Sequence, residues 1–103
     1  MLAKSNQSQQ SETSELRHAA GIWLREQREA AGLSQRELAR MLELEYYTFI
    51  SQLENGRGRI PPNRYRDWAR ALKLDEKTFV RKLLMFYDPV SYEILFEDPA
   101  RAS

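Results

Sequence analysis

The chain of 103 residues contains no cysteine and only one histidine, His18. Without cysteine it has neither a disulfide framework nor a thiolate metal site, and that composition fits a reducing compartment. No apolar run approaches the ~20 residues that a membrane-spanning helix needs, and the first residues lack the apolar stretch of a secretory signal. We therefore expect a cytoplasmic protein without a membrane segment, a metal or a cofactor.

The same shortages argue against catalysis. His18 falls on a predicted helix, and no cluster of acidic residues at metal-ligand spacing accompanies it. The closely spaced Gly56 and Gly58 lack the strand and helix pattern that surrounds a phosphate-binding loop. The remaining composition, 42% hydrophobic and 30% charged, is ordinary for one small globular domain. We predict that the protein is not an enzyme and has no catalytic residues.

Charge is small in total but unevenly placed. The formal net charge is +1. Between Asn55 and Lys73, six basic residues stand against one acidic residue, a local balance of +5. From Leu83 to Ser103, four acidic residues stand against one basic residue, a balance of −3. The basic segment suits phosphate binding, although a solvated helix face would have the same composition.

Helical periodicity dominates, because few stretches alternate apolar and polar residues and strand formers are sparse. We predict an all-α protein of five helices with a short apolar C-terminal extension. Residues 1–13 are expected to be a disordered polar tail, residues 14–88 the helical domain, and residues 89–103 the extension. The sequence VSYEILF within the extension could form a last helical turn or an extended arm.

Capping signals mark where these helices begin and end. The first is expected over about 14–31, with Gly32 as its stop. Ser34 and Glu37 form a capping box for the second, Asn55-Gly56 ends the third (about 46–54), and Pro61-Pro62 starts the fourth. Asp75 caps the fifth, which ends near Tyr87. The predicted buried stripes are Leu38, Ala39 and Leu42; Tyr46, Phe49, Ile50 and Leu53; and Tyr65, Trp68, Ala69 and Leu72.

The second and third helices are joined by only a few residues, which predicts a helix-turn-helix unit. Such a unit places its second helix in the DNA major groove. If the apolar stripe of the third helix faces inward, its outward side chains are short or flat groups without charge: Tyr47, Thr48, Ser51, Gln52 and Asn55. Glutamine, serine and threonine can bond to base edges, and the arginines that follow suit phosphate oxygens.

The stretch from Gly32 to Pro62, GLSQRELARMLELEYYTFISQLENGRGRIPP, resembles the Xre-type, lambda-repressor-like (Cro-like) helix-turn-helix family. The resemblance extends over about 23–74. It implies a five-helix DNA-binding module, usually dimeric. It places base reading on Tyr47, Thr48, Ser51 and Gln52. It places phosphate contacts on Gln35, Arg36, Asn55, Arg57, Arg59 and Arg64.

Two further features follow from the resemblance. Arg28 and Glu54 match positions that form an internal ion pair in this family, which makes them scaffold. The turn holds one residue more than the usual pattern, near Glu45, and Glu43 stands where the family often has glycine. If the extra residue lay inside the third helix, the reading face would rotate by about 100°.

The fifth helix and the extension carry more apolar residues than one buried stripe requires, which indicates a second interface. We predict a symmetric homodimer through Leu83, Phe86, Tyr87, Tyr92, Leu95 and Phe96. The alternative is that the extension folds back over its own domain, near Trp23. The aromatic residues Trp23, Trp68 and Tyr65 are expected in the core.

Together these features predict a sequence-specific, double-stranded-DNA-binding transcriptional regulator. By analogy it would be a repressor that acts as a homodimer on a palindromic operator, with the third helix in the major groove. One alternative is the antitoxin of a toxin–antitoxin pair, which would bind DNA and a protein toxin. Another is a protein-interaction adaptor that has the fold without the DNA contacts.

Overall fold

The computed structural model describes residues 2–97, which form six α-helices, one 3₁₀ turn and no strand. The helices are α1 (Leu2–Ala30), α2 (Gln35–Met41), α3 (Thr48–Glu54), α4 (Tyr65–Ala71), α5 (Glu76–Tyr87) and α6 (Pro89–Phe96). The 3₁₀ turn η1 (Pro62–Arg64) precedes α4. The all-helical prediction is confirmed for this part of the chain, and the extension forms a sixth helix.

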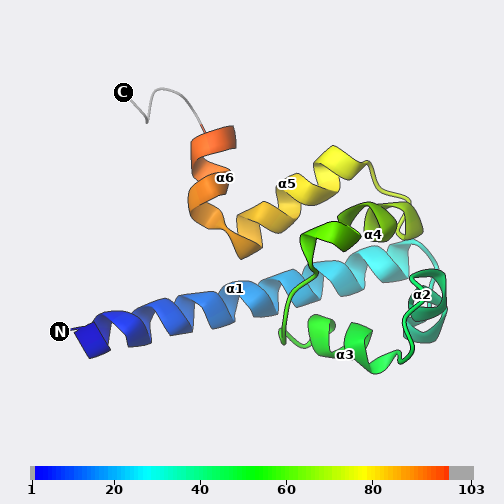
Figure 1. Cartoon of the computed structure of the whole chain (residues 1–103), viewed down its shortest axis with the longest axis horizontal. Helices are drawn as coiled ribbons and strands as arrows, with labels where there is room; N and C mark the ends of the chain where they lie inside the picture. The colour runs from blue at the N-terminus through cyan, green and yellow to red at the C-terminus, as the bar shows by residue number, and fades with distance from the viewer. Residues whose placement is uncertain (1, 98–103) are drawn as a thin grey trace.

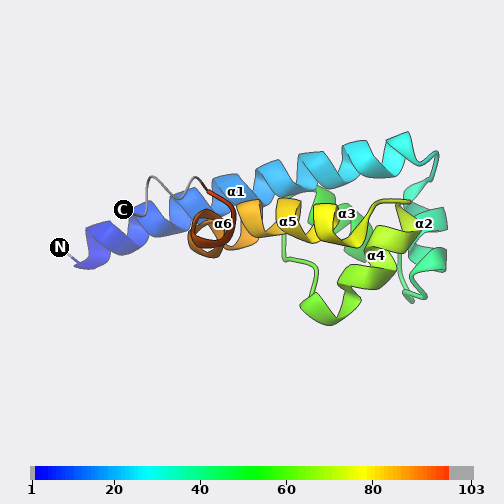
Figure 2. The same cartoon turned by 90° about the horizontal axis from the view of Figure 1, so that it is seen from above.

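Helix α1 is the longest helix and lies between the other elements (Figure 1). It packs against α3 on one side and α5 on the other, and α4 and α6 both contact α5. Seen from above, α6 is viewed almost end-on, next to the end of α5 that it contacts (Figure 2). The helix-turn-helix unit and the C-terminal helices therefore occupy opposite sides of one central helix.

The start of α1 differs from the prediction. The helix begins at Leu2 rather than near Ser14, so residues 2–13 are helical and are not a disordered tail. No glycine or proline occurs before Gly21, so no residue with a strong penalty in a helix interrupts this polar segment. Met1, the first residue of that predicted tail, and residues 98–103 of the predicted extension lie outside the described residues.

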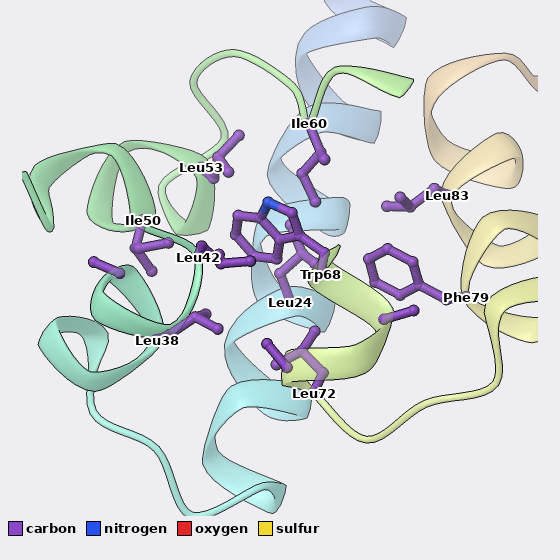
Figure 3. Packing of buried hydrophobic residues seen from close by; sticks show 13 residues of the cluster. Leu24, Leu38, Leu42, Ile50, Leu53, Ile60, Trp68, Leu72, Phe79 and Leu83 are labelled. Atoms are coloured by element: carbon purple, nitrogen blue, oxygen red, sulfur yellow. The ribbon is translucent and has the colours of Figure 1, made fainter. Parts of the chain in front are cut away.

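The core is built around Trp68, which the surrounding helices enclose (Figure 3). Leu38, Ala39 and Leu42 are buried as predicted, and so are Trp68, Ala69 and Leu72. Trp23 and Tyr65 are partly buried against this cluster. The ring of Trp23 stacks on that of Phe79 with centroids 5.8 Å apart. The aromatic residues predicted as core are therefore packing residues.

The predicted helix ends are largely confirmed. Gly32 and Gly56 adopt φ values of +74° and +82° after α1 and α3, a region that glycine enters without steric cost. Asp75 caps α5, since its carboxylate accepts a hydrogen bond of 3.0 Å from the Thr78 N–H. Asp88 caps α6 in the same way, accepting from the Ser91 N–H at 3.1 Å.

Candidate nucleic-acid interface

The start of α2 is fixed by a reciprocal capping box. The Ser34 hydroxyl accepts a hydrogen bond from the Glu37 N–H at 3.0 Å, and the Glu37 carboxylate accepts one from the Ser34 N–H at 2.9 Å. The pKa of Glu37 is lowered, first by that backbone hydrogen bond and then by the Ser34 side chain. Two of the otherwise unpaired N–H groups at this helix end are thereby satisfied.

The turn between α2 and α3 occupies residues 42–47. Leu42 is buried, and its carbonyl accepts a hydrogen bond from Arg64 Nη2. Glu43 adopts φ +56°, the left-handed conformation that glycine enters more easily than a residue with a Cβ atom. Glu45, near which the sequence predicted an additional residue, lies in this turn, because α3 begins only at Thr48.

Tyr46 was predicted to face inward, and this prediction was wrong. Its side chain is 66% exposed. Tyr46 lies before α3, so the helical spacing used to place it does not apply there. Leu44, earlier in the turn, packs against the core instead.

Helix α3 itself has the orientation that the sequence predicted. Ile50 and Leu53 are buried and Phe49 is partly buried. On the other side Thr48, Gln52 and Asn55 are exposed, and Ser51 is half-buried. Among the described residues, no side-chain hydrogen bond or ion pair engages Thr48, Ser51 or Gln52. Their hydroxyl and amide groups are therefore available to an external ligand.

A buried ion pair fixes α3 to α1. Arg28 Nε lies 2.6 Å from Glu54 Oε2, and Arg28 Nη2 donates to Glu54 Oε1 at 3.0 Å. Arg28 Nη1 also donates to the Leu33 carbonyl at 2.8 Å. The hydrogen bonds to Glu54 raise the pKa of Arg28 above its usual value, although burial by itself would lower it. The predicted internal pair is confirmed.

Two predicted phosphate contacts are engaged in this scaffold. The Gln35 side-chain amide donates to Glu54 Oε1 at 3.0 Å. Arg64 holds the Leu42 carbonyl and lies 3.3 Å from the Asp67 carboxylate. Both side chains therefore hold α2 against its neighbours in this structure. Sequence spacing could not show the contacts of Gln35 with Glu54 and of Arg64 with Leu42, because these partners are distant in the chain.

Of the arginines predicted to contact phosphate, Arg36, Arg57 and Arg59 form no ion pair with a carboxylate of the described residues. Arg36 lies over the Tyr47 ring, and Arg59 over the Tyr87 ring, each with Cζ 4.7 Å from the ring centroid. Arg57 is exposed beside the end of α3. Along the chain, Arg36 precedes α3, and Arg57 and Arg59 lie in the loop that follows it.

Arg17 was missed in the sequence. It lies on α1, where Nη1 donates to the Gly58 carbonyl at 3.2 Å and Cζ is 5.4 Å from the Tyr87 ring centroid. It thus ties the loop after α3 to α1 and to the end of α5. Nothing in the local sequence separates this arginine from an ordinary exposed helical base.

The predicted dimer residues fall into two groups. Leu83 is 0% exposed and belongs to the core. Tyr87 is partly buried, and its hydroxyl accepts a hydrogen bond from the Ile60 N–H at 3.2 Å. Burial is the main cause of its raised pKa. In the single chain both residues cover their own domain: Leu83 has no exposed surface, and Tyr87 keeps only part of its surface exposed.

The other four predicted dimer residues lie nearer the surface. Phe86 is partly buried beside Trp23, with ring centroids 6.2 Å apart. Tyr92 is partly buried, and its ring centroid lies 5.4 Å from that of Phe96. Leu95 and Phe96 are exposed. Helix α6 contacts α5, with Arg81 over the Phe96 ring, so part of the extension covers its own domain, while Val90, Ile94 and Leu95 remain exposed in the single chain.

Within residues 2–97, no group of three or more potential metal ligands comes together, and no helix is both long enough and apolar enough to cross a membrane.

This geometry defines a class of protein. A short exposed helix with uncharged polar groups, held by a second helix across a tight turn, is the arrangement that enters a DNA groove. The family of helix-turn-helix domains matches residues 19–79, and the chain belongs to this DNA-binding family. DNA is accordingly a partner of the protein. No curated protein matches the sequence.

Proposed function

We propose that the protein is a sequence-specific regulator of transcription that inserts α3 into the major groove of double-stranded DNA. The observation that carries this proposal is the exposed side of α3, whose side chains are uncharged and unengaged. Thr48, Ser51 and Gln52 would contact base edges, since hydroxyl and amide groups match the donors and acceptors there.

Arg36, Asn55, Arg57 and Arg59 would contact phosphate oxygens. Arg36, on α2, lies over Tyr47 at the start of α3. Asn55, Arg57 and Arg59 follow the end of α3. Contacts at both ends of a recognition helix fix its depth and register on the duplex. Gln35 and Arg64, which hold α2 in place, are not required for this role.

The proposed regulator is a repressor that acts as a homodimer and occludes a palindromic operator. A single module of this kind buries only ~600–1,000 Å² on DNA, less than most specific binders need. Two copies related by a two-fold axis would address half-sites ~34–36 Å apart. The uncovered side of α6, with Val90, Ile94 and Leu95 exposed, supplies apolar area for such an axis.

A second candidate function rests on the same side of α6. Exposed apolar residues on a short helix also fit a different protein chain, as in an antitoxin that binds DNA and covers a toxin. The mass of the purified protein separates the two readings. A dimer at micromolar concentration supports the homodimeric repressor, and a monomer supports a partner of another sequence.

Selection of bound sequences from a random duplex pool tests the main proposal. We expect a palindrome whose half-sites lie about one helical turn apart, ~10 base pairs. Absence of any enriched sequence, with only salt-sensitive non-specific binding, would contradict it.

Two variants then separate base reading from phosphate binding. Gln52→Ala should cost ~1–3 kcal/mol on the selected duplex and relax the preference at one position. Arg57→Ala should weaken binding to all sequences alike and reduce the salt slope by about one unit per protomer. Equal losses on selected and random DNA for both variants would show that the roles are misassigned.

A further inference from the structure

The arginine nearest the start of α3 is held by an aromatic ring. Arg36 is the second residue of α2, and Tyr47 is the residue that precedes α3. The guanidinium carbon of Arg36 lies 4.7 Å from the centroid of the Tyr47 ring. This is within the ~6 Å at which a cation is attracted to a ring face. The stack therefore bridges the two helices of the motif across their turn.

The way in which Arg36 is held differs from that of the scaffold arginines. Arg28 and Arg64 are paired with carboxylates, at 2.6 Å from Glu54 and 3.3 Å from Asp67. A carboxylate neutralises the charge and occupies the N–H edge, whereas a ring face does neither. A guanidinium stacked on a ring keeps its charge and its fork of donors for a phosphate.

We infer that Tyr47 is a positioning residue, whose ring holds the Arg36 guanidinium in place for a DNA phosphate, and that its hydroxyl does not read a base. The inference rests on the proposed DNA-binding function. An exposed arginine samples many rotamers, and a partner that restricts them before binding reduces the entropy lost on binding. The stack offers such a restriction without neutralising the charge.

The chemistry of Tyr47 agrees with this role. The side chains that discriminate base edges are mainly arginine, lysine, asparagine, glutamine, the acids and the small hydroxyls. Tyrosine is common among the groups that contact the DNA backbone. One face of the Tyr47 ring is occupied by Arg36, so that face is not free to stack on a base. Thr48, Ser51 and Gln52 have no such contact and keep the reading role.

Ring stacking alone does not identify a DNA contact. Arg81 lies 4.7 Å from the Phe96 ring centroid, but both residues belong to the C-terminal helices. What distinguishes Arg36 is its place at the junction of α2 and α3. Tyr46 provides an internal comparison, because it is an exposed neighbouring tyrosine for which the described residues show no stacked cation.

A double-mutant cycle on the full chain tests the inference. The variants are Arg36→Ala, Tyr47→Ala, Tyr47→Phe and the Arg36→Ala/Tyr47→Ala pair, measured on the duplex selected from the random pool. A cation–π contact at an exposed site corresponds to about two- to fivefold in affinity. We expect Tyr47→Ala to lower the affinity for the duplex by that factor per protomer. Tyr47→Phe should bind like the parent protein, because the ring remains.

The decisive comparison is made in the Arg36→Ala background, where Tyr47→Ala should cause no further loss. The base preference of Tyr47→Ala, determined by repeating the selection, should be unchanged. A Tyr47→Ala loss that persists without Arg36, or a changed base preference in Tyr47→Phe, would overturn the inference. Tyr46→Ala is the matched control, and its effect should be the same with and without Arg36.

The free protein offers a readout that needs no DNA. The side-chain N–H resonance of Arg36 should show a ring-current shift that Tyr47→Phe retains and Tyr47→Ala removes. If that shift is absent from the parent protein, the stack does not exist in solution and the inference fails by itself. If the shift is present but no duplex is bound, the proposed function fails and the DNA role of the stack fails with it.

Discussion

Helices α3 and α6 are similar in length but present different surfaces. Three residues of α3 are buried, and its exposed residues include Thr48 and Gln52. None of the residues of α6 is fully buried, and its exposed residues include Val90, Ile94 and Leu95. The buried side of helix α3 is thus packed against the domain and its exposed side is polar, which suits a polar ligand such as DNA. Helix α6 leaves apolar area uncovered, which suits another protein surface.

The reason for this difference is the way each helix is supported. Helix α3 crosses α1 closely, with the Arg28–Glu54 pair and Gly21 at the crossing. Helix α6 contacts mainly α5. A rigidly held helix can present side chains in a fixed geometry, which base reading requires. The substitutions below test this contrast, beginning with the support of α3.

The largest effect is expected when the ion pair behind α3 is broken. Glu54→Gln leaves the buried Arg28 guanidinium without its counter-charge, which typically costs ~3–5 kcal/mol of unfolding free energy. Chemical denaturation measures it directly. The control is Glu76→Gln, which removes a surface pair with Arg66 at 3.5 Å and should cost only ~0–1 kcal/mol. Equal midpoints for Glu54→Gln and the parent would refute the supporting role.

The crossing of α1 and α3 also depends on a missing side chain. A Cβ atom at Gly21 would lie 2.5 Å from the Glu54 carbonyl oxygen and 2.6 Å from that of Leu53. Alanine is the better helix former by ~1 kcal/mol, but the backbone must move to admit it. We expect Gly21→Ala to lower stability by ~1–3 kcal/mol.

Glu26→Ala, at an exposed position of the same helix, is the control for Gly21→Ala and should stay within ~0.5 kcal/mol of the parent. A thermal melt of Gly21→Ala at or above that of the parent would mean that the two helices do not approach this closely.

A smaller effect is expected in the turn that sets the start of α3. Glu43 adopts φ +56°, which costs a residue with a Cβ atom roughly 1–2 kcal/mol. Glycine removes that strain but adds freedom to the unfolded chain. We expect Glu43→Gly to raise stability by up to ~1 kcal/mol.

The comparison for Glu43→Gly is Glu45→Gly, because Glu45 lies in the same turn but is not among the described residues with positive φ. That variant should be neutral or destabilising. If both substitutions had the same effect on the denaturation midpoint, backbone strain at Glu43 would not be the cause.

The smallest effect on the stability of the single chain is expected on α6. Ile94 is 78% exposed, so Ile94→Ser should change the unfolding free energy of a monomer by less than ~0.5 kcal/mol. If the outer side of α6 joins two copies, the same change should lower the mass in solution from dimer to monomer. Ile22→Ser, at an exposed apolar position of α1, is the control and should leave the mass unchanged. A dimer that survives Ile94→Ser would place the interface elsewhere.

Local signals in the sequence determined much of the fold. The capping box at Ser34, the cap at Asp75 and the stop at Gly56 each depend on residues a few positions apart, so short spacing suffices to predict them. The stripes of α2 and α4 follow from the helical period alone. The helical period also predicts which residues of α3 are exposed, such as Thr48 and Gln52, once Ile50 is taken as buried.

The tertiary structure decided which partner each longer side chain meets. The Tyr87 hydroxyl bonds to Ile60, 27 positions away, and Arg17 to Gly58, 41 positions away. Gln35 and Arg64 likewise support α2 because Glu54 and Leu42 reach them from other parts of the chain. Helical periodicity says which side of a helix is apolar, but not whether its own domain or another molecule covers that side. Only the packing of distant segments determines that, and it separates the buried Leu83 from the exposed Leu95.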